Sequence, residues 1–142
     1  MNKATKAQEY FLQGYACSQS VLMAYADDLG LNMETAKKVS STFGAGMGRL
    51  RKTCGALTGA FMVLGMKYGN TDPKDMTTKL SSYEKVRELA HEFENLHGTT
   101  DCKELLIKYA DPKAVETRDH HKIICCNLVK DTINILETMI ND

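Results

Sequence analysis

The sequence has little of what interrupts a helix and nothing that marks a strand. Only two prolines occur in 142 residues, Pro73 and Pro112, and both stand where a connection between two helices is expected. No stretch alternates apolar and polar residues for long enough to predict a β-strand. A chain of this length suffices for one domain with its own core and is too short for two ordinary ones. We therefore expect an all-α fold and a single helical domain over residues 1–142.

The chain also lacks an excess of charge of either sign. Lysine plus arginine equals aspartate plus glutamate, at 18 each, so a footprint for nucleic acid or for an anionic membrane surface is missing. The longest apolar run, residues 55–66 with only Thr58 interrupting it, is well short of the ~20 residues that a membrane helix needs. The first residues lack the apolar core of a secretory signal. We expect a cytoplasmic protein that binds neither nucleic acid nor a membrane.

Apolar residues recur at steps of three and four, which predicts helices. The expected fold is a bundle of about five to six helices, at roughly residues 4–29, 33–43, 53–69, 75–97, 101–110 and 119–140. The helix at 75–97 is expected to bury one apolar stripe, which includes Leu80, Tyr83 and Leu96.

None of the five cysteines forms a C-x-x-C pair, so the fold would have to assemble any site that they share. At about 100° per residue on the expected helices, four of them face inward, each from a different helix. These four are Cys17, Cys54, Cys102 and Cys125. Cys126 falls about a quarter-turn away, toward a polar edge. Free cysteine is among the most buried residue types, so each of the four is also explained as core filling.

Cys54 is distinguished by the residues that precede it. It follows Arg49, Arg51 and Lys52 at the expected start of a helix. Cations and a helix N-terminus both favour the thiolate over the thiol, so Cys54 is expected to be the most acidic thiol and the nucleophile. Cys102 also lies at an expected helix start. Burial of a thiol acts in the opposite direction.

A run of glycines stands just upstream of Cys54, at Gly44, Gly46 and Gly48. A dinucleotide-binding G-x-G motif needs a preceding strand, and none is predicted. At least one of these glycines is expected to have a positive φ in a sharp turn. The three glycines together with Arg49 are also candidate residues for cradling an anion or a cofactor's carboxylate. Further on, Gly55 and Gly59 are four residues apart, which would permit close approach of another helix.

The order of the cysteines resembles a family of small proteins named for a C–GCAxxG–C–C pattern and described as putative redox-active proteins. Cys17 matches the first cysteine in GYACSQSVLMAY, and Cys54 lies in the central motif FGAGMGRLRKTCGALTGAFMVLGMKYG. Cys102 in TTDCKELL and Cys125 in ICCNLVKDTINILE match the third and fourth. The chain reads Cys54-Gly55 where the family label reads Gly-Cys. The resemblance covers nearly the whole chain and implies a helical protein with a redox or metal role, without a substrate.

Three functions are open at this point. The first is a thiol-based redox protein, a candidate thiol–disulfide oxidoreductase, in which Cys54 exchanges with a redox partner of unknown identity and with Cys17, Cys102 or Cys125 as resolving thiol. In the second, the same four cysteines ligate an iron–sulfur cluster or zinc. The third is a helical interaction module, such as a homodimer, whose cysteines only fill the core and which needs no cofactor. We favour the first.

Overall fold

The computed structural model describes residues 1–110 and 118–140, and their regular structure is helical. The helices are α1 (Lys3–Leu12), α2 (Cys17–Tyr25), α3 (Met33–Ser41), α4 (Gly44–Met47), α5 (Gly55–Tyr68), α6 (Met76–His97), α7 (Cys102–Tyr109) and α8 (Arg118–Ile140). The only β pairing among the described residues is a single antiparallel bridge between Thr53 and Asp101. The all-α prediction is confirmed. Pro73 lies in the turn before α6, as expected, and Pro112 lies outside the described residues.

The number of helices was predicted too low, because the expected helix at 4–29 is two helices and the short element α4 was not expected. The break lies at Gly14, whose φ of 111° is outside the range of a right-handed helix and is readily adopted by glycine. The Ala16 N–H then donates to the side-chain oxygen of Gln19 at 2.9 Å, which satisfies an amide at the new helix start. Cys17 is consequently the first residue of α2 instead of an interior residue of a long helix.

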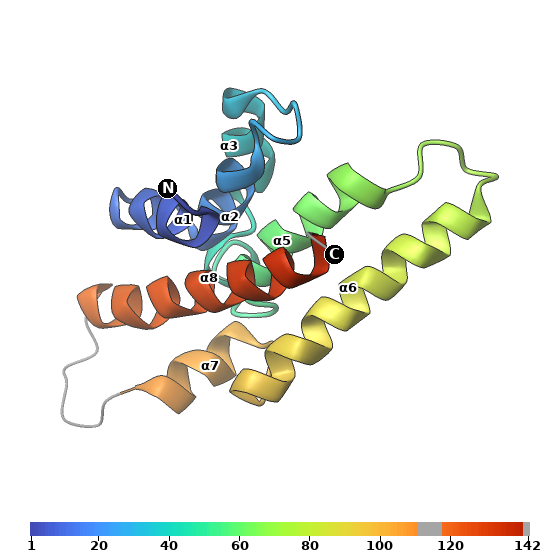
Figure 1. Cartoon of the computed structure of the whole chain (residues 1–142). Helices are drawn as coiled ribbons and strands as arrows, with labels where there is room; N and C mark the ends of the chain where they lie inside the picture. The colour runs from blue at the N-terminus through green and yellow to red at the C-terminus, as the bar shows by residue number, and fades with distance from the viewer. Residues whose placement is uncertain (111–117, 141–142) are drawn as a thin grey trace.

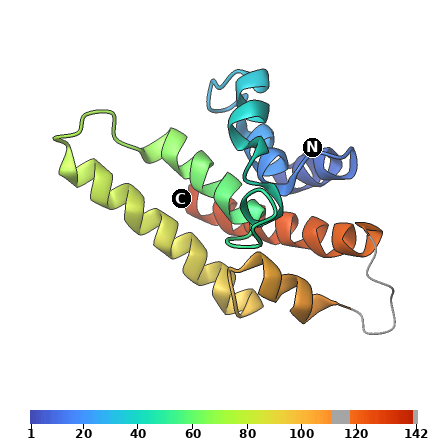
Figure 2. The same cartoon turned by 180° about the vertical axis from the view of Figure 1, so that it is seen from behind.

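The short helix α2 lies at the centre of the molecule and packs against α1, α3, α5 and α8. All of its residues except Gln19 are buried. The hydroxyl groups of its buried serines are hydrogen-bonded. Ser18 donates to the Ser40 carbonyl at 2.7 Å, and Ser20 donates to the Ala16 carbonyl at 2.9 Å. Figures 1 and 2 show α1, α2 and α3 on one side of α5 and α8, with α6 on the other side.

Two glycines on α5 allow α2 to approach closely, as the sequence predicted. A Cβ added to Gly59 would lie 2.6 Å from the Ser18 carbonyl oxygen, and one added to Gly55 would collide with the Cys17 sulfur. Real Cβ atoms do not reach such separations, so only glycine fits at both positions. The same crossing therefore packs the core and places the Cys17 side chain beside the start of α5.

The apolar stripe predicted for α6 is only partly buried. Leu80, Tyr83 and Leu96 are half exposed, whereas the buried residues of this helix are Ser82, Leu89, Phe93 and His97. For Leu80 and Tyr83 the reason is visible in Figure 1, where the first half of α6 and the end of α5 project beyond the other helices as a two-helix arm. A helix in such an arm has one neighbour to pack against, so part of its apolar surface stays in water.

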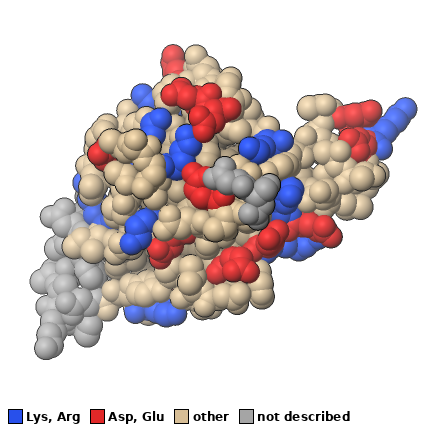
Figure 3. All heavy atoms as spheres, viewed as in Figure 1, with Lys and Arg blue, Asp and Glu red and all other residues tan. Residues whose placement is uncertain are grey.

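The face of the molecule in Figure 3 carries acidic and basic side chains interspersed, without one large patch of either sign. None of the described helices combines the length and the apolar character that crossing a bilayer requires. No single surface feature on that face stands out as a site, which directs attention to the interior.

Candidate functional site

Two segments that are far apart in the sequence hold Cys54 and Cys102 near each other. The amide of Cys54 donates to the carbonyl of Thr100 at 2.9 Å, and the amide of Cys102 donates to the carbonyl of Lys52. These bonds flank the bridge between Thr53 and Asp101. The segment before α5 is thereby paired with the segment before α7, so both helices start from one anchored point.

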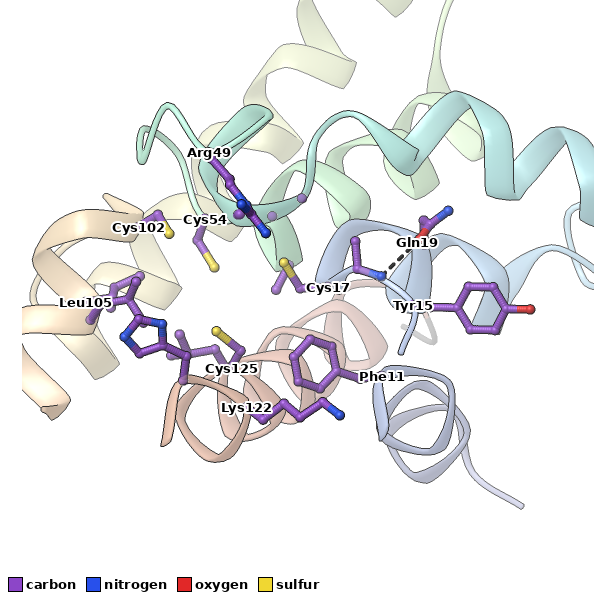
Figure 4. Close-up of a pocket in the computed structure, with 18 of the residues that line it drawn as sticks. Phe11, Tyr15, Cys17, Gln19, Arg49, Cys54, Cys102, Leu105, Lys122 and Cys125 are labelled. Carbon is purple, nitrogen blue, oxygen red and sulfur yellow. Dashed lines mark hydrogen bonds between the residues drawn. The ribbon is translucent and has the colours of Figure 1, made fainter. Parts of the chain in front are cut away.

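All four inward-facing cysteines line one cavity of about 680 Å³. They come from four parts of the fold, with Cys17 on α2, Cys54 before α5, Cys102 on α7 and Cys125 on α8. Figure 4 shows their sulfurs pointing toward a common space. Cys126 does not line the cavity, and its carbonyl accepts a hydrogen bond from the Gln8 side chain at 3.4 Å. All five cysteines are free thiols.

Three of these thiols stand at helix starts. Cys17 is the first residue of α2, Cys102 is the first residue of α7, and Cys54 is the N-cap residue of α5. Sequence reasoning placed only Cys54 and Cys102 there, because it did not break the first helix. Two residues in the sequence could have indicated this break. Gly14 ends the first helix, and Gln19, five residues later, caps the start of the second.

The expectation of an acidic Cys54 is wrong in this structure. Burial raises the pKa of the Cys54 thiol well above its ordinary value, and the neighbouring Cys17 sulfur raises it further. The first-turn amides of Ala56 and Leu57 lower this pKa, which is the helix-terminus effect that the sequence predicted, but burial outweighs them. With an exposed fraction of only 5%, Cys54 stays a protonated thiol near neutral pH.

Burial also raises the pKa of two other cavity thiols, Cys125 and Cys17. It raises the pKa of Cys125 to about 12, and Cys17 and Cys102 add to this effect, while Arg51 acts against it. Burial likewise raises the pKa of Cys17, opposed chiefly by the backbone amide of Ala45. The thiol form is therefore favoured at both positions, and any reaction there starts from a proton-bearing sulfur.

The cations upstream of Cys54 act on other thiols than the sequence suggested. Arg51 donates from Nη1 to the sulfur of Cys102 at 3.8 Å. Arg49 and Lys52 are both exposed, and of the two only Arg49 lines the cavity. A further cation, Lys122, lines the cavity from α8. Sequence reasoning missed Lys122, although its position three residues before Cys125 puts both on the same side of a helix.

The glycine run includes α4, which is a left-handed turn and not a regular right-handed helix. Five consecutive residues have positive φ: Ala45 (55°), Gly46 (71°), Met47 (68°), Gly48 (60°) and Arg49 (66°). The prediction of a positive φ in this run is confirmed by two of its glycines. Residues other than glycine pay about 1–2 kcal/mol each in this conformation, so surrounding contacts must hold the turn. Two backbone bonds do so, from Gly48 to the Gly44 carbonyl and from Lys52 to the Gly46 carbonyl.

This turn contributes directly to the cavity. It contacts α2, α5 and α7, and Figure 2 shows it beside the start of α5. Of the four residues expected to cradle a ligand, Gly44, Gly48 and Arg49 line the cavity. Gly46 does not line it, because it lies behind Cys102, where an added Cβ would be 2.7 Å from the Cβ of that cysteine.

The four cysteines were also candidate metal ligands. Among the side chains of residues 1–110 and 121–140, no group of three or more His, Cys, Asp or Glu is arranged to hold a metal ion. The four cysteines share a cavity without forming such a group.

The fold and the site define a class of protein: a helical bundle in which free thiols from four parts of the chain surround one internal cavity. The chain belongs to the C_GCAxxG_C_C family, described as putative redox-active proteins, whose family model matches residues 15–139. The match includes all four cavity cysteines, and it confirms the family that their order indicated. No curated protein and no solved structure matches the chain.

Proposed function

We propose that this protein carries out thiol–disulfide exchange, with Cys102 as the attacking thiol and Cys17 as the resolving thiol. The observation that carries the proposal is the contact of Arg51 with the Cys102 sulfur, inside the cavity that Cys17 also lines. A cationic donor favours negative charge on a sulfur, and the thiolate is the nucleophile in exchange reactions. This assignment replaces Cys54, whose pKa is raised by burial.

Cys17 is the best placed resolving thiol. It interacts electrostatically with each of the other three cavity thiols, Cys54, Cys102 and Cys125. Burial raises the pKa of Cys17, but the amide of Ala45 opposes this rise and can donate to a Cys17 thiolate when one forms. Gly55 leaves room for the Cys17 sulfur, because any larger residue would collide with it.

The reaction has two steps. The Cys102 thiolate attacks one sulfur of a disulfide, a new bond joins that sulfur to Cys102, and the other half leaves as a thiolate that takes a proton from water. Cys17, after releasing its proton to water, attacks the Cys102 sulfur and expels the second half. The protein then holds a Cys17–Cys102 disulfide, and the substrate disulfide has been reduced by two electrons to two thiols. When the same steps run in reverse, two thiols of a partner reduce the Cys17–Cys102 disulfide and the partner thiols become a disulfide.

The test is disulfide mapping by mass. Reduced protein is treated with hydroxyethyl disulfide without oxygen, quenched with acid and digested without reductant. We expect a Cys17–Cys102 link in the natural protein, an unresolved mixed disulfide on Cys102 in Cys17→Ser, and no link in Cys102→Ser. Cys126→Ser is the matched control and should behave like the natural protein, because Cys126 does not line the cavity.

Two outcomes would overturn this proposal. One is a mixed disulfide with hydroxyethyl disulfide that forms only on Cys126 while the protein is folded, which would show that the cavity thiols do not exchange. The other is a stoichiometric metal in protein purified without oxygen, lost in Cys102→Ser and retained in Cys126→Ser. That result would make the four cysteines ligands of a metal or an iron–sulfur cluster.

A further inference from the structure

The charged side chains that line the cavity are of one sign. Among the described lining residues, Arg49, Arg51 and Lys122 are cationic and none is acidic. The whole chain is balanced, with 18 basic and 18 acidic residues, and the face in Figure 3 mixes both signs. The positive lining is therefore a local property of the cavity and not a reflection of overall composition.

Two of these cations are placed on either side of the thiols. In Figure 4, Arg49 extends from the left-handed turn over one side of the sulfurs, and Lys122 extends from α8 on the opposite side. Neither forms an ion pair with a described residue. Arg51, in contrast, is engaged with the Cys102 sulfur. Two cations thus remain to bind an incoming group of opposite charge.

The size and depth of the site indicate a small molecule. A volume of about 680 Å³ is within the range of roughly 300–1,000 Å³ that is usual for small-molecule sites. Apolar side chains, among them Phe11, Leu105 and Leu128, complete the wall. The Cys17 and Cys102 sulfurs belong to residues with exposed fractions of 8% and 7%, which a disulfide on the surface of a folded protein would not reach.

We propose that the disulfide that exchanges with Cys102 is a small molecule with a carboxylate on each half. One carboxylate binds Arg49 and the other binds Lys122, so that the sulfur–sulfur bond lies over the thiols between them. This inference rests on the proposed exchange function and names its substrate class. The two steps and their electron balance are those given above, and the products are two carboxylate-bearing thiols and the Cys17–Cys102 disulfide.

A series of disulfides of matched size tests the charge preference. Dithiodipropionate carries two negative charges, hydroxyethyl disulfide carries none, and cystamine carries two positive charges. For each disulfide, the rate at which it oxidises the protein thiols is divided by the rate at which it reacts with mercaptoethanol at the same pH. This ratio removes differences in the intrinsic reactivity of the disulfides. After this correction we expect dithiodipropionate to react at least about tenfold faster than cystamine, with hydroxyethyl disulfide between them. Added salt should narrow the difference, because it screens the cations.

Charge-neutralising variants locate the effect. Arg49→Gln with Lys122→Gln should bring the corrected rates of the three disulfides close together, mainly by slowing the reaction with dithiodipropionate. Lys130→Gln is the matched control on α8, because Lys130 is exposed and does not line the cavity. Equal corrected rates for all three disulfides would overturn the substrate class and leave the exchange function standing. Failure of all three to oxidise the cavity thiols would overturn both.

Discussion

Arg51 donates a hydrogen bond to the sulfur of Cys102 over 3.8 Å, although 51 residues separate the two along the chain. The contact exists because the amide of Cys102 bonds to the carbonyl of Lys52, the residue after Arg51. Arg51 is only three residues before Cys54 in the sequence, but its guanidinium contacts a different thiol, Cys102. Which thiol this cation contacts is determined by the tertiary pairing of two loops and not by local sequence.

Removing this cation should slow the reaction of Cys102. In Arg51→Gln we expect the rate of Cys102 alkylation by iodoacetamide to fall by roughly three- to tenfold, as for the loss of one charge-assisted hydrogen bond at a partly buried site. The measurement is the mass of the Cys102 peptide as a function of time at neutral pH. Lys52→Gln is the control, since its side chain is exposed and outside the cavity. An unchanged rate in Arg51→Gln would remove the argument for Cys102 as the attacking thiol.

A pair of glycines on α5 tests the close crossing with α2. Gly55→Ala introduces a Cβ that collides with the Cys17 sulfur and lies 3.1 Å from the Phe43 carbonyl oxygen. We expect a loss of about 1–3 kcal/mol in the free energy of unfolding, measured by urea denaturation, together with slower formation of the Cys17–Cys102 disulfide. Gly65→Ala is the control on the same helix, because its Cβ would meet nothing within 4 Å. It should stabilise the protein by about 0.5–1 kcal/mol. Equal effects of the two substitutions would contradict the packing described here.

Much of the fold could be read from periodicity, since α5, α6, α7 and α8 begin and end close to their expected positions. Periodicity did not reveal the break at Gly14, because apolar residues continue across it at helical spacing. Nor did it reveal the exposure of Leu80 and Tyr83. Which side of a helix is covered depends on how far its neighbours extend, and that is a property of the tertiary arrangement.

The site was predictable in its members and not in its electrostatics. The four cysteines that share the cavity are those whose helical positions face inward, because angular position on a helix follows from spacing alone. The pKa of Cys54 could not be obtained in this way, since it depends on the depth of burial, which outweighs two helix-start amides. The positive φ of Met47 was also not indicated by local sequence, whereas Lys122 could have been found from its spacing to Cys125.

Cys54 should be unreactive in the folded protein over the range in which ordinary thiols titrate. Because burial raises its pKa well above the usual value near 9, its thiolate is scarce from pH 6 to pH 9. We expect iodoacetamide to label Cys54 only slowly in this range and to label it readily in concentrated urea. Cys126, which is outside the cavity, is the internal control in the same digest. Rapid labelling of folded Cys54 at pH 6 would restore it as the nucleophile and contradict its burial.

His97 should make the stability of the protein depend on pH. Its side chain is buried, with Nδ1 2.5 Å from the Tyr109 hydroxyl, Nε2 3.1 Å from Asp131 Oδ2, and the Phe93 ring packed against it. Burial lowers the pKa of His97, and Lys108 lowers it further, while Asp131 opposes both. In the unfolded chain the same histidine titrates near its ordinary value of about 6.5.

The sign of the effect follows from proton binding. Below pH 6.5 the unfolded chain binds a proton at His97 before the folded protein does, so acid favours unfolding. The stability that neutral His97 contributes to the folded protein is fully present above pH 6.5, and it is lost as the pH falls toward the lowered pKa of His97 in the folded state. We expect the urea midpoint to decrease between pH 7.5 and pH 5. In His97→Gln the protein should be less stable at pH 7.5 and its midpoint should fall less on acidification, whereas His91→Gln, at an exposed position of α6, should follow the natural protein. A fall of the same size in His97→Gln as in the natural protein would assign the pH dependence to other groups.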